Sequence, residues 1–95
     1  MSKKLIYIAG PITSNPDTYY IKFLIVESFL TSLGYDVYNP ARLKEGLDYK
    51  FYVDDGLKNL MRCDAICMLP DWTKSKGACL EHHYAETIGI PILYM

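Results

Sequence analysis

The apolar residues of this chain follow two alternating patterns. Four short apolar runs, at residues 4–9, 35–38, 64–69 and 91–94, are rich in β-branched and aromatic side chains, which is typical of buried strands. Three longer segments between them carry apolar residues at helical spacing, at 16–33, about 49 or 51 to 62, and 76–88. The chain is therefore predicted to alternate β-α-β-α-β-α-β within one domain spanning residues 1–95.

The first predicted helix has one apolar stripe and a clear end. Gly34 follows its last apolar position, where a glycine commonly closes a helix. We expect the stripe to face the sheet. Its members are Phe23, Val26, Phe29, Leu30 and Leu33.

Strands that are joined by helices form a parallel sheet with right-handed crossovers. We expect a three-layer α/β sandwich, with helices on both faces of a four-stranded sheet in the order 2-1-3-4. The order then reverses between the first and third strands, and ligands of open α/β sheets bind outside the carboxyl ends of strands at such a point. The loop after residue 9 and the segment 69–75 are therefore predicted to meet at one crevice.

Glu81 is the most informative residue of the predicted helix 76–88. It lies in the middle of a small apolar arc that includes Ala78 and Ala85, on the side that should pack against the sheet. A carboxylate there is costly to desolvate unless it is paired, hydrogen-bonded or facing a pocket. Two interpretations follow: Glu81 is a nucleophile or base at the crevice, or it is tied down by a neighbouring Lys or Arg.

Two loops supply candidate binding residues. Gly10 and Pro11 follow the first strand, and a glycine there lets a ligand approach the backbone closely. Neither a dinucleotide-binding nor a P-loop fingerprint is present. Ser75 and Gly77 stand at the start of the helix 76–88, where a hydroxyl and free N–H groups could hold a phosphate or sugar. Plain helix capping by Ser75 is the alternative.

Asp54 and Asp55 begin the exposed part of the second helix. They either complement the helix dipole, or one of them acts across the crevice from Glu81. Two carboxylates that flank a glycosidic bond are the usual equipment for glycosyl chemistry. Tyr7 is either a core residue or turns its hydroxyl towards Glu81. Trp72 is either a stacking platform for a base or a lid over the core.

Composition and charge exclude several classes of function. The net charge of −1 implies no basic face, so we expect no nucleic-acid polymer as partner. His82 and His83 are adjacent and point about 100° apart on a helix, so we expect no metal site, and nothing indicates a cofactor. We expect no signal peptide, no membrane-spanning segment and no disulfide framework, and we expect a cytoplasmic protein.

Three motifs resemble the nucleoside 2-deoxyribosyltransferase superfamily. They are Tyr7-Ile8-Ala9-Gly10-Pro11, Cys63-Asp64-Ala65, and Ser75-x-Gly-Ala-x-x-Glu81-x-x-x-Ala85 followed by Gly89-Ile90-Pro91. The segment 69–78 is similar to a small, often phage-encoded branch of that superfamily. The resemblance covers most of the chain, and the motifs fall in the family's order.

The resemblance implies a flavodoxin-like (Rossmann-like) fold and cleavage of the N-glycosidic bond of a 2′-deoxynucleoside or its 5′-monophosphate. Glu81 matches the family's nucleophile, which forms a covalent deoxyribosyl-enzyme, and Tyr7 matches the Tyr that orients it. Ser75 matches the Ser of the monophosphate hydrolases, whereas transferases acting on free nucleosides carry an Asp there. The family's Asp before a Leu in the second helix is Gly56 here. A homodimer or larger homo-oligomer is also implied.

Three hypotheses follow. The first is a deoxyribosyl transferase or hydrolase with Glu81 as nucleophile, Asp55 or Asp54 as acid or base, and Tyr7 as the positioning group. Ser75, Gly77, Gly10 and Pro11 would then cradle the phosphate or sugar, and Trp72 would cover the base. The second is a nucleotide-binding module without turnover, for sensing or sequestration. The third is a structural or interaction domain.

Overall fold

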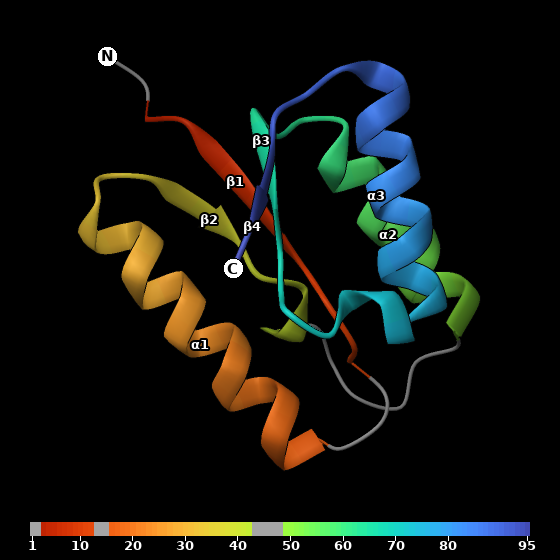
Figure 1. Cartoon of the computed structure of the whole chain (residues 1–95), viewed down its shortest axis with the longest axis horizontal. Helices are drawn as coiled ribbons and strands as arrows, with labels where there is room; N and C mark the ends of the chain where they lie inside the picture. The colour runs from red at the N-terminus through yellow and green to blue at the C-terminus, as the bar shows by residue number, and fades with distance from the viewer. Residues whose placement is uncertain (1–2, 13–15, 43–48) are drawn as a thin grey trace.

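The computed structural model describes residues 3–12, 16–42 and 49–95 of the chain (Figure 1). The predicted loop residues 13–15 and most of the connection 41–47 lie outside the described residues. The strands are β1 (Leu5–Ala9), β2 (Asp36–Tyr38), β3 (Ala65–Met68) and β4 (Ile92–Tyr94). The α-helices are α1 (Pro16–Ser32), α2 (Tyr49–Leu60) and α3 (Lys76–Ile88), and short 3-10 turns occupy η1 (Pro40–Arg42) and η2 (Trp72–Lys74).

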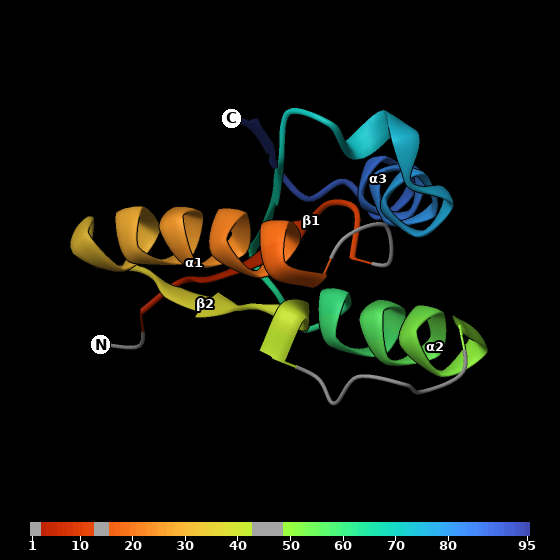
Figure 2. The same ribbon diagram turned by 90° about the horizontal axis from the view of Figure 1, so that it is seen from below.

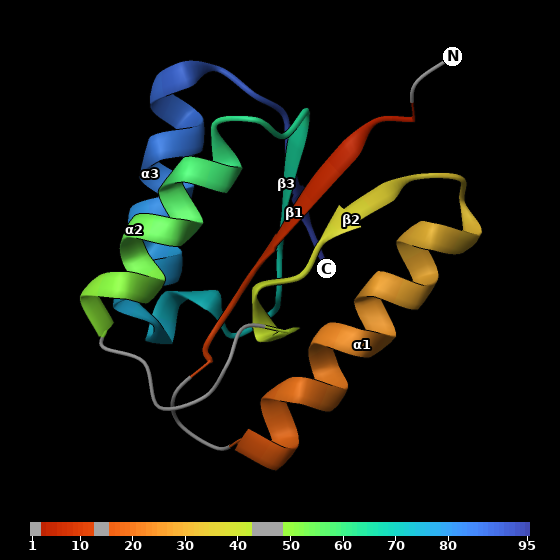
Figure 3. The same ribbon diagram turned by 180° about the vertical axis from the view of Figure 1, so that it is seen from behind.

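The four strands form one parallel sheet in the order β2-β1-β3-β4, which confirms the predicted order. Helix α1 covers one face, and α2 and α3 lie next to each other on the other face (Figures 2 and 3). In the register of the sheet, Tyr7 of β1 lies opposite Tyr38 of β2 and Ile66 of β3. The three-layer α/β sandwich is therefore as predicted.

Strand β1 contributes to the core on both sides of the sheet, because successive side chains of a strand point to opposite faces. Ile6 and Ile8 pack with Phe23 of α1. Tyr7 and Ala9 face the other way and belong to the cluster under α2 and α3. This alternation aims the Tyr7 side chain at the face on which α3 carries Glu81.

The predicted stripe of α1 is only partly right. Phe23, Val26 and Leu30 are buried, but Phe29 is 50% and Leu33 is 58% exposed. Phe29 is rotated about 100° from Leu30 around the helix and so turns away from the sheet. Leu33 lies beyond the last residue of α1, in the turn that Gly34 closes with a φ of 97°.

Among the helices of the described residues, none is both long and apolar enough to cross a membrane. The same residues form no cluster of three or more His, Cys, Asp or Glu side chains that could hold a metal ion.

Candidate active site

A cleft opens beyond the carboxyl end of β1, with walls from α2 and from the first turns of α3. Counted together with the open solvent at its mouth, it spans about 480 Å³. The predicted site residues Tyr7, Gly10, Ser75, Gly77 and Glu81 all line it. The remaining lining residues are Ile12, Pro40, Tyr52, Val53 and Ala78.

Glu81 and Tyr7 form the polar centre of this cleft. The Tyr7 hydroxyl donates a hydrogen bond to Glu81 Oε2. Tyr7 is 1% exposed, and burial, followed by the nearby Glu81 carboxylate, raises its pKa well above the ordinary tyrosine value. The hydroxyl therefore keeps its proton at neutral pH and acts as the donor.

Burial also raises the pKa of Glu81 to about 7, and the Tyr7 hydrogen bond opposes part of that rise. Low-dielectric surroundings disfavour the charged carboxylate, whereas a donated hydrogen bond favours it. Near pH 7, Glu81 is therefore present both as the protonated acid and as a poorly solvated carboxylate. Such a group can act as a base or as a nucleophile towards an electrophilic carbon in the cleft.

Ser75 has the capping role that was the alternative interpretation of this residue. As the residue before α3, it accepts a hydrogen bond at Oγ from the Ala78 backbone N–H, at 3.1 Å. The cap fixes the first turn of α3 at the edge of the cleft, and Gly77 in that turn adds no side chain to the opening. A serine hydroxyl that accepts one hydrogen bond can still donate another.

Gly10 lies where the chain leaves β1 and packs against Leu69. A Cβ atom on Gly10 would lie 2.6 Å from Leu69 Cδ1, so a side chain there would displace the segment after β3. The absence of a side chain is therefore needed for packing as well as for an open cleft. Pro11 is half-buried beside it and is not one of the residues lining the cleft.

The two aspartates of α2 lie in different surroundings. Asp55 accepts a hydrogen bond of 2.5 Å from the Tyr38 hydroxyl, and the Tyr38 ring stacks on Tyr7 with centroids 5.3 Å apart. Burial, followed by the hydrogen bond to Asp55, raises the pKa of Tyr38. Asp54 pairs with Lys58 at 3.0 Å on the surface, where its side chain is 64% exposed. Of these two aspartates, Asp55 is therefore the one linked to the Tyr7–Glu81 pair, through the Tyr38 ring that stacks on Tyr7.

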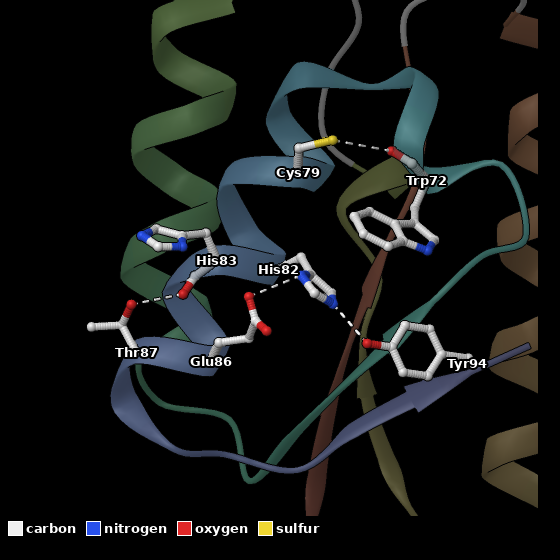
Figure 4. A network of polar contacts seen from close by, with 7 residues as sticks. All are labelled: Trp72, Cys79, His82, His83, Glu86, Thr87 and Tyr94. Carbon is white, nitrogen blue, oxygen red and sulfur yellow. Dashed lines mark hydrogen bonds and ion pairs between the residues drawn. The ribbon is translucent and has the colours of Figure 1, made fainter.

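Trp72 lies apart from the cleft lining and forms a separate cluster with His82 and Tyr94 (Figure 4). Its indole stacks on the His82 imidazole at a centroid distance of 4.3 Å. His82 Nε2 is 2.7 Å from the Tyr94 hydroxyl, and Nδ1 is 3.4 Å from Glu86. Trp72 therefore joins η2 to α3 and β4, a packing role closer to the lid interpretation than to the stacking platform.

Sequence reasoning missed Tyr38. Tyr38 ends β2, which is the neighbour of β1, so its place at the carboxyl edge of the sheet followed from the predicted strand order. The sequence singled out Gly56 as the position of the family's Asp, but not its close approach to Glu81, because that depends on how near α2 comes to α3. Sequence reasoning also missed Tyr52 and Val53, which line the cleft from α2.

Comparisons with solved structures identify the fold. The structure is similar to a 2-deoxyribosyltransferase from the psychrotolerant bacterium Bacillus psychrosaccharolyticus, with a TM-score of 0.73 and 19% identity, over 95% of this chain and 70% of that one. It is also similar to a 2-deoxyribosyltransferase from Leishmania mexicana, with a TM-score of 0.75 and 24% identity, over 97% of this chain and 63% of that one. The chain thus spans less than two thirds of the Leishmania protein.

These similarities show a nucleoside 2-deoxyribosyltransferase-like fold, as the sequence motifs predicted. Residues 4–94 match the family described as "Domain of unknown function (DUF4406)", and the chain belongs to that family. No curated protein matches the sequence.

Proposed function

We propose that this chain cleaves, or transfers a group at, the N-glycosidic bond of a 2′-deoxynucleoside or its 5′-monophosphate, with Glu81 as the nucleophile. The observation that carries the proposal is the Glu81 carboxyl, partly buried on the wall of the cleft and hydrogen-bonded by the Tyr7 hydroxyl. A fold shared with 2-deoxyribosyltransferases supports the same assignment.

In the proposed reaction, an ionised Glu81 oxygen bonds to C1′ of the sugar. The C1′–N bond breaks at the same carbon, and its electron pair leaves with the base, which takes up a proton. Water or a second base then displaces Glu81 from C1′ and restores the free carboxylate. Two steps through a covalent intermediate replace one difficult displacement. Tyr7 holds the attacking carboxylate in place by its hydrogen bond.

Asp55 is proposed as the acid or base partner, acting with Tyr38 rather than alone, because the two share a short hydrogen bond beside Tyr7. The Ser75 and Gly77 turn is proposed to receive the 5′-phosphate, since the α3 N-terminus offers backbone N–H groups and a hydroxyl at the cleft edge. A 5′-monophosphate is therefore the favoured substrate.

The test is to incubate the purified protein with each of the four deoxynucleoside 5′-monophosphates and the four free deoxynucleosides, and to follow free base by chromatography. Glu81→Gln is the key variant. Glu86→Gln is its matched control, because Glu86 lies on the same helix with its side chain 57% exposed. We expect base release from at least one monophosphate, its loss in Glu81→Gln, and its survival in Glu86→Gln.

Equal rates of base release in wild type and Glu81→Gln would contradict the proposal. If no substrate releases base, calorimetry with the same nucleotides separates the other hypotheses. Saturable binding without turnover identifies a nucleotide-binding module, and the absence of binding leaves a structural domain.

We also propose that the chain assembles as a homodimer or larger homo-oligomer. Helix α1 carries apolar residues on its outer side at a spacing of four, the row by which two helices commonly interlock. The row consists of Ile21, Ile25 and Phe29 of α1 and is continued by Leu33 just after the helix, each at least half exposed. A contiguous apolar surface of this kind is unusual on a monomer.

Light scattering coupled to size-exclusion chromatography tests the assembly. Ile25→Glu places a charge in the middle of the row, because Ile25 is 63% exposed. Thr31→Glu is the control, an exposed polar position on the same helix about 120° around the axis from Ile25. We expect Ile25→Glu alone to lower the mass towards that of a monomer. A monomeric wild type at high micromolar concentration would refute the assembly.

A further inference from the structure

Gly56 lies where α2 passes close to the Tyr7–Glu81 pair. It is a buried residue in the interior of α2, and α2 packs beside α3, which carries Glu81 (Figure 3). Glycine is less favourable than alanine in a helix interior, so its presence there calls for a local reason.

The reason is steric. A Cβ atom added to Gly56 would overlap Glu81 Oε2 and lie 2.7 Å from the Tyr7 hydroxyl oxygen. A Cβ atom and an oxygen that are not covalently bonded do not approach so closely, so one of the groups would have to move. The hydrogen-bonded pair thus occupies the space that any side chain at position 56 would need.

The Glu81 carboxylate is the group that would yield. Tyr7 lies in the central strand β1, is 1% exposed, and has its ring stacked on Tyr38. The carboxylate, in contrast, is the end of a flexible side chain, and the open part of the cleft lies next to it. A methyl group on residue 56 would push the carboxylate off the Tyr7 hydroxyl and into the cleft.

We propose that Gly56 is a positioning residue for Glu81: its missing side chain lets α2 close over the carboxylate and hold it against the Tyr7 hydroxyl. This inference rests on the proposed function, in which Glu81 attacks the sugar. Gly56 itself touches no reacting atom of the substrate.

A consequence concerns the ionisation of Glu81. Burial is the larger cause of its raised pKa, and the Tyr7 hydrogen bond opposes it. Displacing the carboxylate into the open cleft removes both the burial and the hydrogen bond. Because burial has the larger effect on the pKa, its loss dominates. The pKa of Glu81 should therefore fall towards the ordinary glutamate value in Gly56→Ala.

The experiment compares wild type, Gly56→Ala and the control Lys58→Ala, an exposed position two residues further along α2. We measure kcat, KM, the pH dependence of base release, and the Glu81 titration by ¹³C NMR. In Gly56→Ala we expect kcat to fall by about 10- to 100-fold, as for a nucleophile displaced by about 1 Å, with KM changed less than about threefold. The acid limb of the rate profile should move to lower pH.

Unchanged kcat and an unchanged Glu81 titration in Gly56→Ala would overturn the inference. The NMR titration needs no turnover, so it tests the positioning of Glu81 even if wild type releases no base. If wild type releases no base, the proposed function is wrong, and the titration of Glu81 still decides whether Gly56 positions it.

A second background separates an effect of Gly56→Ala on folding from its effect on Glu81. In Tyr7→Phe/Glu81→Ala both oxygens facing position 56 are absent. There Gly56→Ala should raise the melting temperature, as expected for alanine in a helix, and by more than in wild type, where the added methyl group must displace the carboxylate. Equal effects in the two backgrounds would show that the pair does not fill the space at Gly56, and the inference would be wrong.

Discussion

Removing the Tyr7 hydroxyl by Tyr7→Phe should separate the two influences on Glu81. The substitution keeps the buried ring that stacks on Tyr38 but deletes the donor to Glu81 Oε2. Burial of the carboxyl then acts without opposition, because the hydrogen bond was what favoured the charged form. The pKa of Glu81 should therefore rise further above its ordinary value.

The size of this effect follows from the strength of a hydrogen bond to a charged group, about 1.5–3 kcal/mol. At about 1.36 kcal/mol per pH unit, this moves the acid limb of the rate profile upward by about one to two pH units. With the pKa of Glu81 at about 7, half of the wild-type molecules are ionised at pH 7. The ionised fraction of the variant falls to roughly 1–10%, so base release at pH 7 slows by roughly 5- to 50-fold.

The assay is kcat/KM for base release between pH 5 and pH 10, because this ratio reports ionisations of the free enzyme. Tyr35→Phe is the control, since Tyr35 lies outside the cleft lining. We expect the rate of Tyr7→Phe to recover largely at high pH. A loss that is equal at every pH would refute the reasoning, because it would mean that the hydroxyl does not act through the ionisation of Glu81.

Two further predictions concern stability and the aspartates. Burial raises the pKa of Glu81 from 4.5 to about 7 in the fold, so its contribution to stability is full below about pH 4.5 and declines as the pH rises to about 7. At pH 8, Glu81→Gln should therefore increase the free energy of unfolding by up to about 3 kcal/mol in urea titrations, and at pH 4 it should not increase it. The same increase in the free energy of unfolding at both pH values would contradict the burial of the charge. Asp55→Asn should slow base release at least about tenfold, because it weakens the hydrogen bond from the Tyr38 hydroxyl beside the site. Asp54→Asn, on the surface, should change the rate of base release less than about twofold. The reverse order of these two effects would exclude Asp55 as the partner of Glu81.

The strand order was predictable from the sequence because it depends on the alternation of short and long apolar segments. Glu81 was also recognisable, since a carboxylate in the middle of a small apolar arc needs a partner or a pocket. In contrast, Asp54 and Asp55 are neighbours about 100° apart on a helix, and the sequence does not say which one faces inward. Only the folded structure brings Asp55 of α2 to the Tyr38 hydroxyl at the end of β2.

The rest depends on how elements pack against one another in space. The stacking of Trp72 on His82 depends on how η2 folds back on α3, and no local pattern reports it. The close fit of Gly56 over Glu81 depends on the distance between two helices. The exposed Phe29 shows the same limit, because an apolar residue beside a stripe can face the sheet or solvent according to how much of the helix the sheet covers.

The central claim is that Glu81 bonds covalently to the sugar, and intact-protein mass spectrometry tests it most directly. The protein is incubated with a deoxynucleotide that carries fluorine at C2′, which withdraws electron density from C1′ and slows release of the sugar from the enzyme. We expect the mass to increase by one sugar phosphate, with the adduct mapped to Glu81 and absent from Glu81→Gln. Release of free base with no adduct, or an adduct on another residue, would contradict the account.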